Sequence, residues 1–307
     1  MAPEVMKRKG REATMQRSQI SHMFCWVPAL WSAARSQIRK GARLSDTLPE
    51  DKVTELRSEV AKLYARVATE PDGKFHFHRG SEYASTLLNY DRSALAAIPR
   101  LSTESFAGVG NPHAVAPIRR GEVVLDVGSG SGTDLLLAAH QVGAGGRAIG
   151  IEMTDEMLQR CQASIAESGL RQVEVRRGDA ENLPVDDGSI DTVISNGVLN
   201  LVPNKERAVR EIYRVLRPGG RLLLSDIALT SGLGRLLRSS VDLWALCVGG
   251  ALREEEVVGL VTGVGFRQVR TTECFDCIRG TSSEFLARRL GVHGMNLYAQ
   301  KPESNDD

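Results

Sequence analysis

The sequence is poor in cysteine and in net charge, and each shortage excludes a class of protein. Five cysteines in 307 residues are too sparse, and odd in number, for the disulfide framework of a small secreted protein. The formal net charge is +1, so no overall basic field indicates a nucleic-acid partner. No apolar run approaches the length of a membrane-spanning helix. We therefore expect a globular protein of the reducing cytoplasm with no nucleic-acid or membrane partner, and no pattern that indicates its oligomeric state.

The charge is unevenly distributed, because basic residues are concentrated before Arg43. A short apolar stretch at 23–31 lies inside this basic region and contains Pro28. A basic stretch before an apolar one is typical of a targeting segment, but the proline and the lack of a clear cleavage site argue against that interpretation. We expect residues 1–48 to be a disordered basic extension, with a targeting segment as the alternative. Residues 301–307 form an acidic tail.

Residues 49–118 are predicted to form a cover of helices and loops. Apolar residues recur at helical spacing over 50–68, and Pro71 with Gly73 ends that helix. The stretch from 80 to 112 is rich in loop residues, with a short helix predicted near 94–98. The apolar face of the long helix contains Val53, Leu56, Val60, Leu63, Tyr64 and Val67.

Two polar features of this region could bind a ligand. His76 and His78 form an H-x-H pair, but no third ligand lies near them in the sequence, so we expect no metal site there. Asn111 lies in a Gly-Asn-Pro cluster, which is typical of a turn. The turn interpretation is favoured, with a polar contact from Asn111 to a ligand as the alternative.

Strands alternate with helices at short intervals from 119 to 300, which predicts an α/β fold with a mainly parallel sheet covered on both faces. The expected helices are 135–140, 154–168 and 204–216, with a turn over 217–221 and two further helices over 230–262. Cys161 falls beside apolar residues of the second helix and is expected to be an inert core thiol. The expected strands are 122–127, 148–152, 173–176, 190–194, 222–226, 266–270 and 296–300.

The turn after the first strand is rich in glycine and follows an acid, Asp126. Its spacing is G-x-G-x-G, which differs from the G-x-G-x-x-G of dinucleotide-binding folds. A turn of this kind presents backbone N–H groups and a helix N-terminus at the carboxyl end of the strand. The alternative is a tight turn that binds nothing. The residues of interest are Gly128, Ser129, Gly130 and Gly132.

Two more acids follow strands and favour a nucleotide-like ligand. Glu152 ends the second strand, where a carboxylate can accept hydrogen bonds from both hydroxyls of a ribose. Asp179 follows the third strand. Its carboxylate could accept a hydrogen bond from the amino group of an adenine, while the N–H of Ala180 donates one to a ring nitrogen. A surface loop is the alternative for this second pair.

Together these motifs resemble the class I methyltransferases that depend on S-adenosylmethionine (SAM), and within them the arsenite methyltransferases and their close relatives. The resemblance implies a Rossmann-like seven-stranded sheet over 119–300, SAM as cofactor and methyl transfer to a small molecule, with trivalent arsenic as a candidate. The motifs that carry it are Gly110-Asn-Pro, Val124-Leu-Asp-Val-Gly-Ser-Gly-Ser-Gly-Thr-Asp134, Gly150-Ile-Glu-Met-Thr154, Ile194-Ser-Asn-Gly-Val-Leu-Asn-Leu-Val-Pro203, Arg214-Val-Leu-Arg-Pro-Gly-Gly-Arg221 and Cys247-x-Gly-Gly-Ala251.

The resemblance also implies individual roles. Asp126 and the glycines of the turn would hold the methionine end of SAM, and Asn196 would line that side. Glu152 would hold the ribose and Met153 would pack on the adenine, whose edge Asp179 and Ala180 would bind. Tyr64 matches a tyrosine of the family's N-terminal helix that covers the cofactor.

The sequence departs from the family where the substrate would bind. Arsenite methyltransferases hold trivalent arsenic with cysteines, and this chain has Val109 and Gly197 at two of those positions. Cys247 is retained and is the predicted catalytic thiol. Cys274 and Cys277 form a Cys-x-x-Cys that would supply replacement sulfurs if the C-terminal loop folds over the site.

These departures leave other functions open. An O-, N- or C-methyltransferase of an organic metabolite is one, with His113 as a candidate base, and a non-catalytic SAM-binding protein is another. A nucleic-acid base methylase is disfavoured because Asn196 is followed by Gly-Val-Leu, without the Pro-Pro-aromatic run of that class. A nicotinamide oxidoreductase is disfavoured by the G-x-G-x-G spacing.

Overall fold

The computed structural model describes residues 50–70, 73–230, 244 and 249–303. No helix within these ranges is long and apolar enough to cross a membrane. The helices, in chain order, are α2 (Glu50–Thr69), α3 (Gly80–Leu87), α4 (Arg92–Ala96), α5 (Arg100–Glu104), the 3-10 turn η1 (Pro112–Ala114), α6 (Thr133–Val142), α7 (Asp155–Ser168), α8 (Lys205–Val215), α11 (Glu254–Val264) and α12 (Glu284–Leu290).

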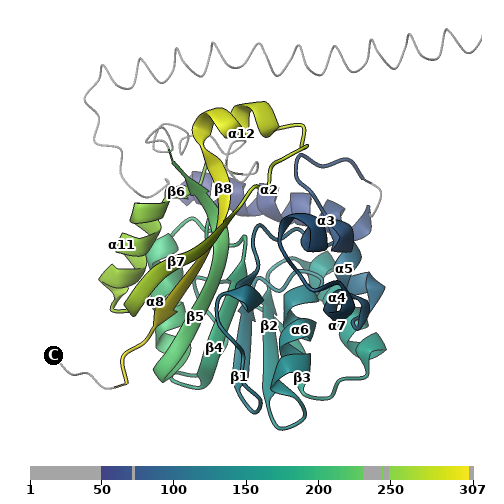
Figure 1. Cartoon of the computed structure of the whole chain (residues 1–307), viewed down its shortest axis with the longest axis vertical. Helices are drawn as coiled ribbons and strands as arrows, with labels where there is room; N and C mark the ends of the chain where they lie inside the picture. Colours follow the sequence, from purple (N-terminus) through teal and green to yellow (C-terminus); the bar gives the residue numbers. More distant parts are fainter. Residues whose placement is uncertain (1–49, 71–72, 231–243, 245–248, 304–307) are drawn as a thin grey trace, which may run out of the picture. The chain divides into compact units, whose positions relative to one another are not determined.

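The strands form one twisted sheet in the order β3-β2-β1-β4-β5-β8-β7, and the short β6 pairs with β5 beyond the end of β4 (Figure 1). Strands β1 to β6 pair in parallel, whereas β8 runs antiparallel to both β5 and β7. This is the α/β fold predicted from the sequence, with β6 added to the seven expected strands. The strands are β1 (Val123–Val127), β2 (Arg147–Glu152), β3 (Val173–Arg177), β4 (Ile190–Asn196), β5 (Leu216–Leu229), β6 (Leu252–Arg253), β7 (Arg267–Phe275) and β8 (Val292–Gln300).

The alternation of side chains along β1 divides the core into two layers. Leu125 and Val127 pack with residues of α8 and α11 on one face, and Val124 packs with α6 and the segment after η1 on the other. Helices therefore cover both faces, as Figure 1 shows. Because successive strand residues point to opposite faces, one apolar run such as β1 supplies both layers.

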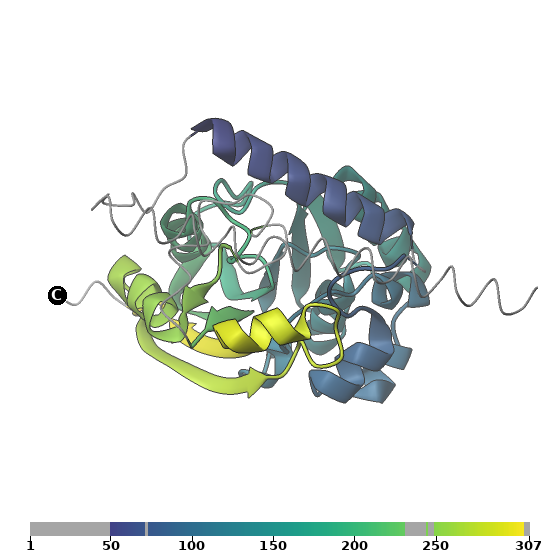
Figure 2. The ribbon, with the colours of Figure 1, turned by 90° about the horizontal axis from the view of Figure 1, so that it is seen from above.

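The region before β1 packs onto the same core as the rest of the described chain. Tyr83 and Phe106 share a hydrophobic cluster with Leu135 and Leu136 of α6. Helix α2 and α12 both lie at the end of the sheet where the parallel strands terminate (Figure 2). This end is therefore the place where a ligand site can be enclosed.

Several local predictions differ from the structure. The turn expected over 217–221 lies inside β5, which begins at Leu216. Its pairing with β4 shifts register between Leu216 and Arg221, and Gly219 takes a positive φ of 75° there. The loop-rich stretch from 80 to 112 contains three short helices and η1, where one helix was expected. Cys161 is buried as predicted, and its burial raises the pKa of the thiol. The basic extension 1–48, residues 304–307 of the acidic tail, and positions 231–243 and 245–248 of the predicted helical region 230–262 lie outside the described residues. The described part of that region contains α11.

A buried ion pair joins β1 to β4 and β5. The Arg221 guanidinium donates to both carboxylate oxygens of Glu122 at 2.6 Å and to the Thr192 hydroxyl at 2.8 Å. It also donates to the carbonyl oxygen of Pro117 at 2.8 Å. All the charged oxygens are paired, so removing one partner would leave an uncompensated charge in the interior.

We expect Arg221→Met to lower the free energy of unfolding by about 3–5 kcal/mol, because the Glu122 carboxylate is then buried alone. The exposed pair of Arg210 with Glu206 on α8 is a matched control, and Arg210→Met should change stability by less than about 0.5 kcal/mol. Urea unfolding of both variants measures the difference. Equal losses in the two variants would contradict this account of the pair.

Candidate active site

A cleft of about 1070 Å³, counting its open mouth, lies at the carboxyl ends of β1, β2, β3 and β4 beneath α2. The structure brings ten of the predicted cofactor residues to its wall. They come from α2, the turn after β1, the end of β2, the loop after β3 and the end of β4: Tyr64, Asp126, Gly128, Ser129, Gly130, Glu152, Met153, Asp179, Ala180 and Asn196.

Gly132, His113 and Cys247 are the other predicted site residues. Gly132 does not line the cleft and is the N-cap residue of α6. A β-carbon at this position would lie 2.9 Å from Cys161 Sγ, so the glycine allows close packing there. His113 also lies away from the cleft, with Nδ1 3.0 Å from Gln141 Nε2 and Nε2 3.2 Å from Asp134 Oδ1. Its position does not favour the base role that the sequence left open. Cys247 lies outside the described residues.

The Glu152 carboxylate fastens the glycine turn to β2. One oxygen accepts from the N–H of Gly130 at 3.0 Å and the other from the N–H of Thr154 at 2.8 Å. Burial raises the pKa of Glu152, and these N–H donors oppose that shift. Gly130 has a φ of 53° and open space in front of its α-carbon, which leaves its backbone accessible to a ligand.

The Asp126 carboxylate is buried in the cleft close to two other carboxylates. Its Oδ2 atom has no hydrogen-bond partner among the described residues. Burial raises the pKa of Asp126 well above its usual range, and the neighbouring carboxylates of Asp134 and Glu152 raise it further. Arg57 is the one basic residue among the described residues of the wall, and it pairs with Asp179 at 2.8 Å. The inner part of the cleft therefore suits a cationic ligand.

The Asn196 side chain connects the cleft to the segment before β1. Its oxygen accepts from the N–H groups of Val109 and Gly110 at 2.8 and 3.3 Å. Its nitrogen donates to the Gly110 carbonyl, to the Tyr90 hydroxyl and to Asp134 Oδ2 at 3.0 to 3.1 Å. Tyr90 in turn donates to Asp134 Oδ1 at 2.7 Å. Asn196 lines the cleft as predicted, but these contacts make it first a positioning residue.

Sequence reasoning missed Arg57, Asp134 and Tyr90 as parts of this site. Arg57 is one of many charged residues on a helix whose apolar stripe was the only readable pattern. Asp134 ends the motif that was recognised, so its place beside the glycine turn was available as a signal. Tyr90 lies in a segment with no motif, and only the tertiary fold brings it to Asp134.

A second cavity of about 610 Å³, also counting its open mouth, adjoins the cleft. The two share Tyr64, Ala107, Gly108 and Gly197 as wall residues. The rest of the second cavity is mostly apolar, and its remaining wall residues are His76, Phe77, His78, Tyr83, Val109, Ile227, Cys277, Ile278, Thr281, Ser283, Ala287 and Val292.

The Cys-x-x-Cys pair is divided between two environments. Cys277 is buried and lines the second cavity, whose wall also includes Val109 and Gly197, whereas Cys274 is exposed on β7 and lines neither cavity. The two histidines of the H-x-H pair line the second cavity without a third ligand among the described residues. Burial lowers the pKa of His76 to about 4, so this side chain is neutral near pH 7.

Comparison with known proteins agrees with this geometry. Residues 118–268 match a family described as "Methyltransferase domain". An arsenite methyltransferase of Halobacterium salinarum is 33% identical over 319 aligned positions, which cover 97% of this chain and 79% of that protein. The human arsenite methyltransferase is 36% identical over a shorter region, 47% of this chain and 40% of its own length.

A solved structure gives the same result in three dimensions. The crystal structure of an arsenic(III) S-adenosylmethionine methyltransferase from Chlamydomonas reinhardtii superposes with a TM-score of 0.61 at 32% identity, covering 70% of this chain and 74% of that one. The glycine turn, the acids Asp126 and Glu152 at the carboxyl ends of β1 and β2, and these relatives agree with one another. The chain is therefore a SAM-dependent methyltransferase and belongs to the family of the arsenite methyltransferases and their close relatives.

Proposed function

We propose that the protein transfers the methyl group of SAM to trivalent arsenic that is held by thiols in the second cavity. The observation that carries this proposal is the position of Cys277, which lies in a cavity that shares a wall with the cleft. The wall of that cavity also includes Val109 and Gly197, the positions where arsenite methyltransferases carry cysteines. A sulfur is therefore supplied to this region from a different part of the chain.

The charge of the cleft supports SAM as its occupant. SAM carries a positive sulfonium and a positive ammonium group, and Asp126, Asp134 and Glu152 put three carboxylates around the inner cleft. The unpartnered Oδ2 atom of Asp126 can accept from the ammonium. We place the ribose at Glu152, the adenine against Met153 and the base edge at Asp179 and Ala180, as the sequence predicts.

The second cavity supports a thiophilic substrate of small size. Trivalent arsenic is soft and prefers sulfur ligands, and Cys277 offers one buried thiol there. Val109 and Ile227 are apolar residues of the same wall, and with both reactants bound they would keep water away from the reacting atoms. Cys247 is proposed as a second thiol, and external thiols complete the coordination.

Bound SAM supplies a methyl group on a positive sulfur. Arsenic attacks with its lone pair, so an As–C bond forms while the S–CH₃ bond breaks and its electron pair stays on the departing sulfur. Arsenic passes formally from the +III to the +V state, and thiol reductant returns it to +III. The residues of the chain bind and orient the two reactants, and no protein base is needed for this step.

A second candidate is methyl transfer to an apolar organic metabolite. The mostly apolar lining of the second cavity favours it, because two of the family's thiols are replaced by Val109 and Gly197. A non-catalytic SAM-binding role is the third. The three differ in their products, so one assay separates them.

SAM affinity should rise with pH and then level off. Burial and two neighbouring carboxylates raise the pKa of Asp126 in the free protein, and a bound cation lowers it again. Below the pKa of the free protein, binding therefore releases a proton and strengthens as pH increases. Titration calorimetry in two buffers of different ionisation enthalpy measures this release, because the difference between the two binding enthalpies gives the number of protons released.

Asp126→Asn should remove this pH dependence and weaken SAM binding by about 10–100-fold, the effect of losing one charged hydrogen bond. Glu167→Gln, an exposed acid of α7, is the matched control and should behave as the wild type. An affinity that is flat with pH in the wild type, or the same slope in Asp126→Asn, would refute the role of Asp126.

With arsenite, SAM and a thiol reductant, the protein should form methylated arsenic, measured by chromatography coupled to mass spectrometry. Cys277→Ser should slow the reaction by more than about tenfold, a loss of about 1.4 kcal/mol or more, while SAM affinity stays the same. Cys25→Ser, in the predicted basic extension, is the control thiol. Wild-type rates in Cys277→Ser would remove this residue from the substrate site, and methylated organic product without methylated arsenic would favour the second candidate.

A further inference from the structure

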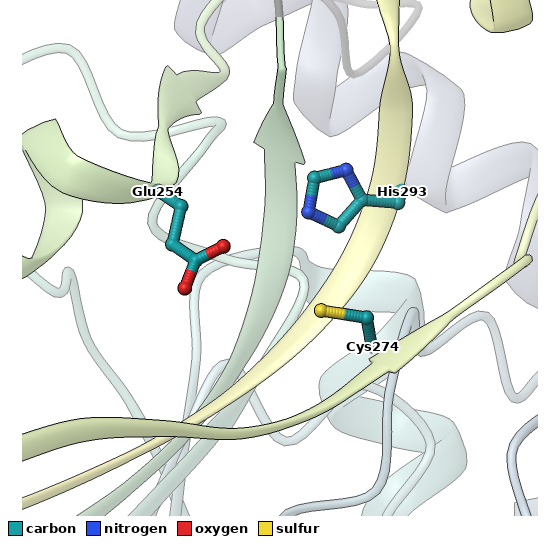
Figure 3. Close-up of side chains that lie close together, drawn as sticks. All are labelled: Glu254, Cys274 and His293. Atoms are coloured by element: carbon teal, nitrogen blue, oxygen red, sulfur yellow. The ribbon is translucent and has the colours of Figure 1, made fainter.

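Three side chains that lie far apart in the sequence meet on one face of the sheet, outside both cavities. The carboxylate of Glu254, the thiol of Cys274 and the imidazole of His293 each offer an atom that lies within 4.8 Å of the other two (Figure 3). These are the three kinds of side chain that bind zinc in proteins. We propose that Glu254, Cys274 and His293 form a zinc site.

The strand register positions all three ligands. Ala228 of β5 pairs with Leu252 of β6 on one side and with His293 of β8 on the other. Cys274 of β7 pairs with Met295, which lies two residues beyond His293 and therefore on the same face of β8. Glu254 begins α11 directly after β6. The sheet thus holds the backbones of the three ligands in place without an ion, so binding an ion costs little conformational entropy.

The hydrogen bond of His293 prepares its ring for an ion. Nδ1 lies 3.0 Å from the carbonyl oxygen of Gly291. A carbonyl oxygen only accepts, so Nδ1 carries the hydrogen and donates it. In the neutral ring the lone pair is then on Nε2, and a backbone partner of this kind is typical of histidines that bind metals.

The other two ligands have no competing partner. Within the described ranges, neither the Glu254 carboxylate nor the Cys274 thiol makes a hydrogen bond or ion pair. Cys274 is exposed and the other two are half-buried, so an ion here reaches solvent. Three protein ligands leave a fourth tetrahedral position for water.

The donor set selects the class of ion. A thiolate is a poor ligand for Mg²⁺ and Ca²⁺, which prefer oxygen. Sulfur, imidazole nitrogen and carboxylate oxygen together suit Zn²⁺, which binds all three. None of the three residues lines the cleft or the second cavity, so the proposed ion would lie outside both. A bound ion would join the beginning of α11 to β7 and β8.

The test uses the full chain after treatment with EDTA and dialysis, titrated with Zn²⁺ in competition with a chromophoric chelator. We expect the wild type to bind one Zn²⁺ tightly. In Glu254→Gln, Cys274→Ser and His293→Gln the affinity for Zn²⁺ should fall more than about tenfold. Co²⁺ in place of Zn²⁺ should give a thiolate charge-transfer band in the near ultraviolet that Cys274→Ser abolishes. Thermal unfolding in EDTA checks that each variant is folded, and Cys274→Ala replaces any serine variant that is not.

The controls separate this site from the other thiols. Cys277→Ser, Cys25→Ser, Cys247→Ser and the exposed His140→Gln should each bind Zn²⁺ as the wild type does. The proposal is overturned if the wild type binds no Zn²⁺ or if Cys274→Ser keeps its affinity and its Co²⁺ spectrum. An equal loss in Cys277→Ser or Cys247→Ser would overturn it as well, since the ion would then be held by those thiols.

Discussion

The side-chain amide of Asn196 is the contact on which both halves of the site depend. It accepts two backbone N–H groups from the segment before β1 and donates to the Gly110 carbonyl and to Asp134. This segment forms the wall between the cleft and the second cavity. The approach is close enough that a side chain at Gly108 would clash with the Asn196 amide. A small shift of this one group would therefore move the cofactor wall and the substrate wall together.

Charge and polarity divide the two cavities in a way that suits a transfer between them. The cleft buries three carboxylates, and burial together with the other two raises the pKa of Asp126. One oxygen of Asp126 has no hydrogen-bond partner in the described part of the chain, which favours a cationic donor. The second cavity is mostly apolar and contains a buried thiol. A positive methyl donor and a soft, neutral acceptor would each be stabilised on its own side of the shared wall. Methyl transfer where the two cavities adjoin would cancel the donor's sulfonium charge, and the apolar side would keep water from competing as the acceptor.

The sequence predicted those parts of the site that lie within a few residues of a strand end. Asp126, Glu152 and Asp179 lie at or just after the carboxyl ends of three parallel strands, so the sheet necessarily brings them to one edge. The sequence could not predict that Cys274 and Cys277 lie in different environments. Strand β7 ends at Phe275, between the two cysteines, and the position of that end cannot be read from the Cys-x-x-Cys spacing. The sequence could not place His113 either, because its neighbours Gln141 and Asp134 lie in α6 and only the packing of η1 on that helix brings them together. The turn expected over 217–221 lies within β5 as an irregularity, because the pairing with β4 shifts register between Leu216 and Arg221 and Gly219 takes a positive φ. The sequence indicated the turn but not that strand pairing already begins before it, at Leu216.

The central claim is that methyl donor and acceptor occupy neighbouring cavities on either side of residues 107–109. A crystal structure with S-adenosylhomocysteine and arsenite, phased for the anomalous scattering of arsenic, tests it most directly. The account predicts the adenosyl ligand in the cleft, with its sulfur facing the shared wall, and an arsenic peak in the second cavity bonded to Cys277 Sγ. An arsenic peak elsewhere, or an adenosyl ligand outside the cleft, would contradict it.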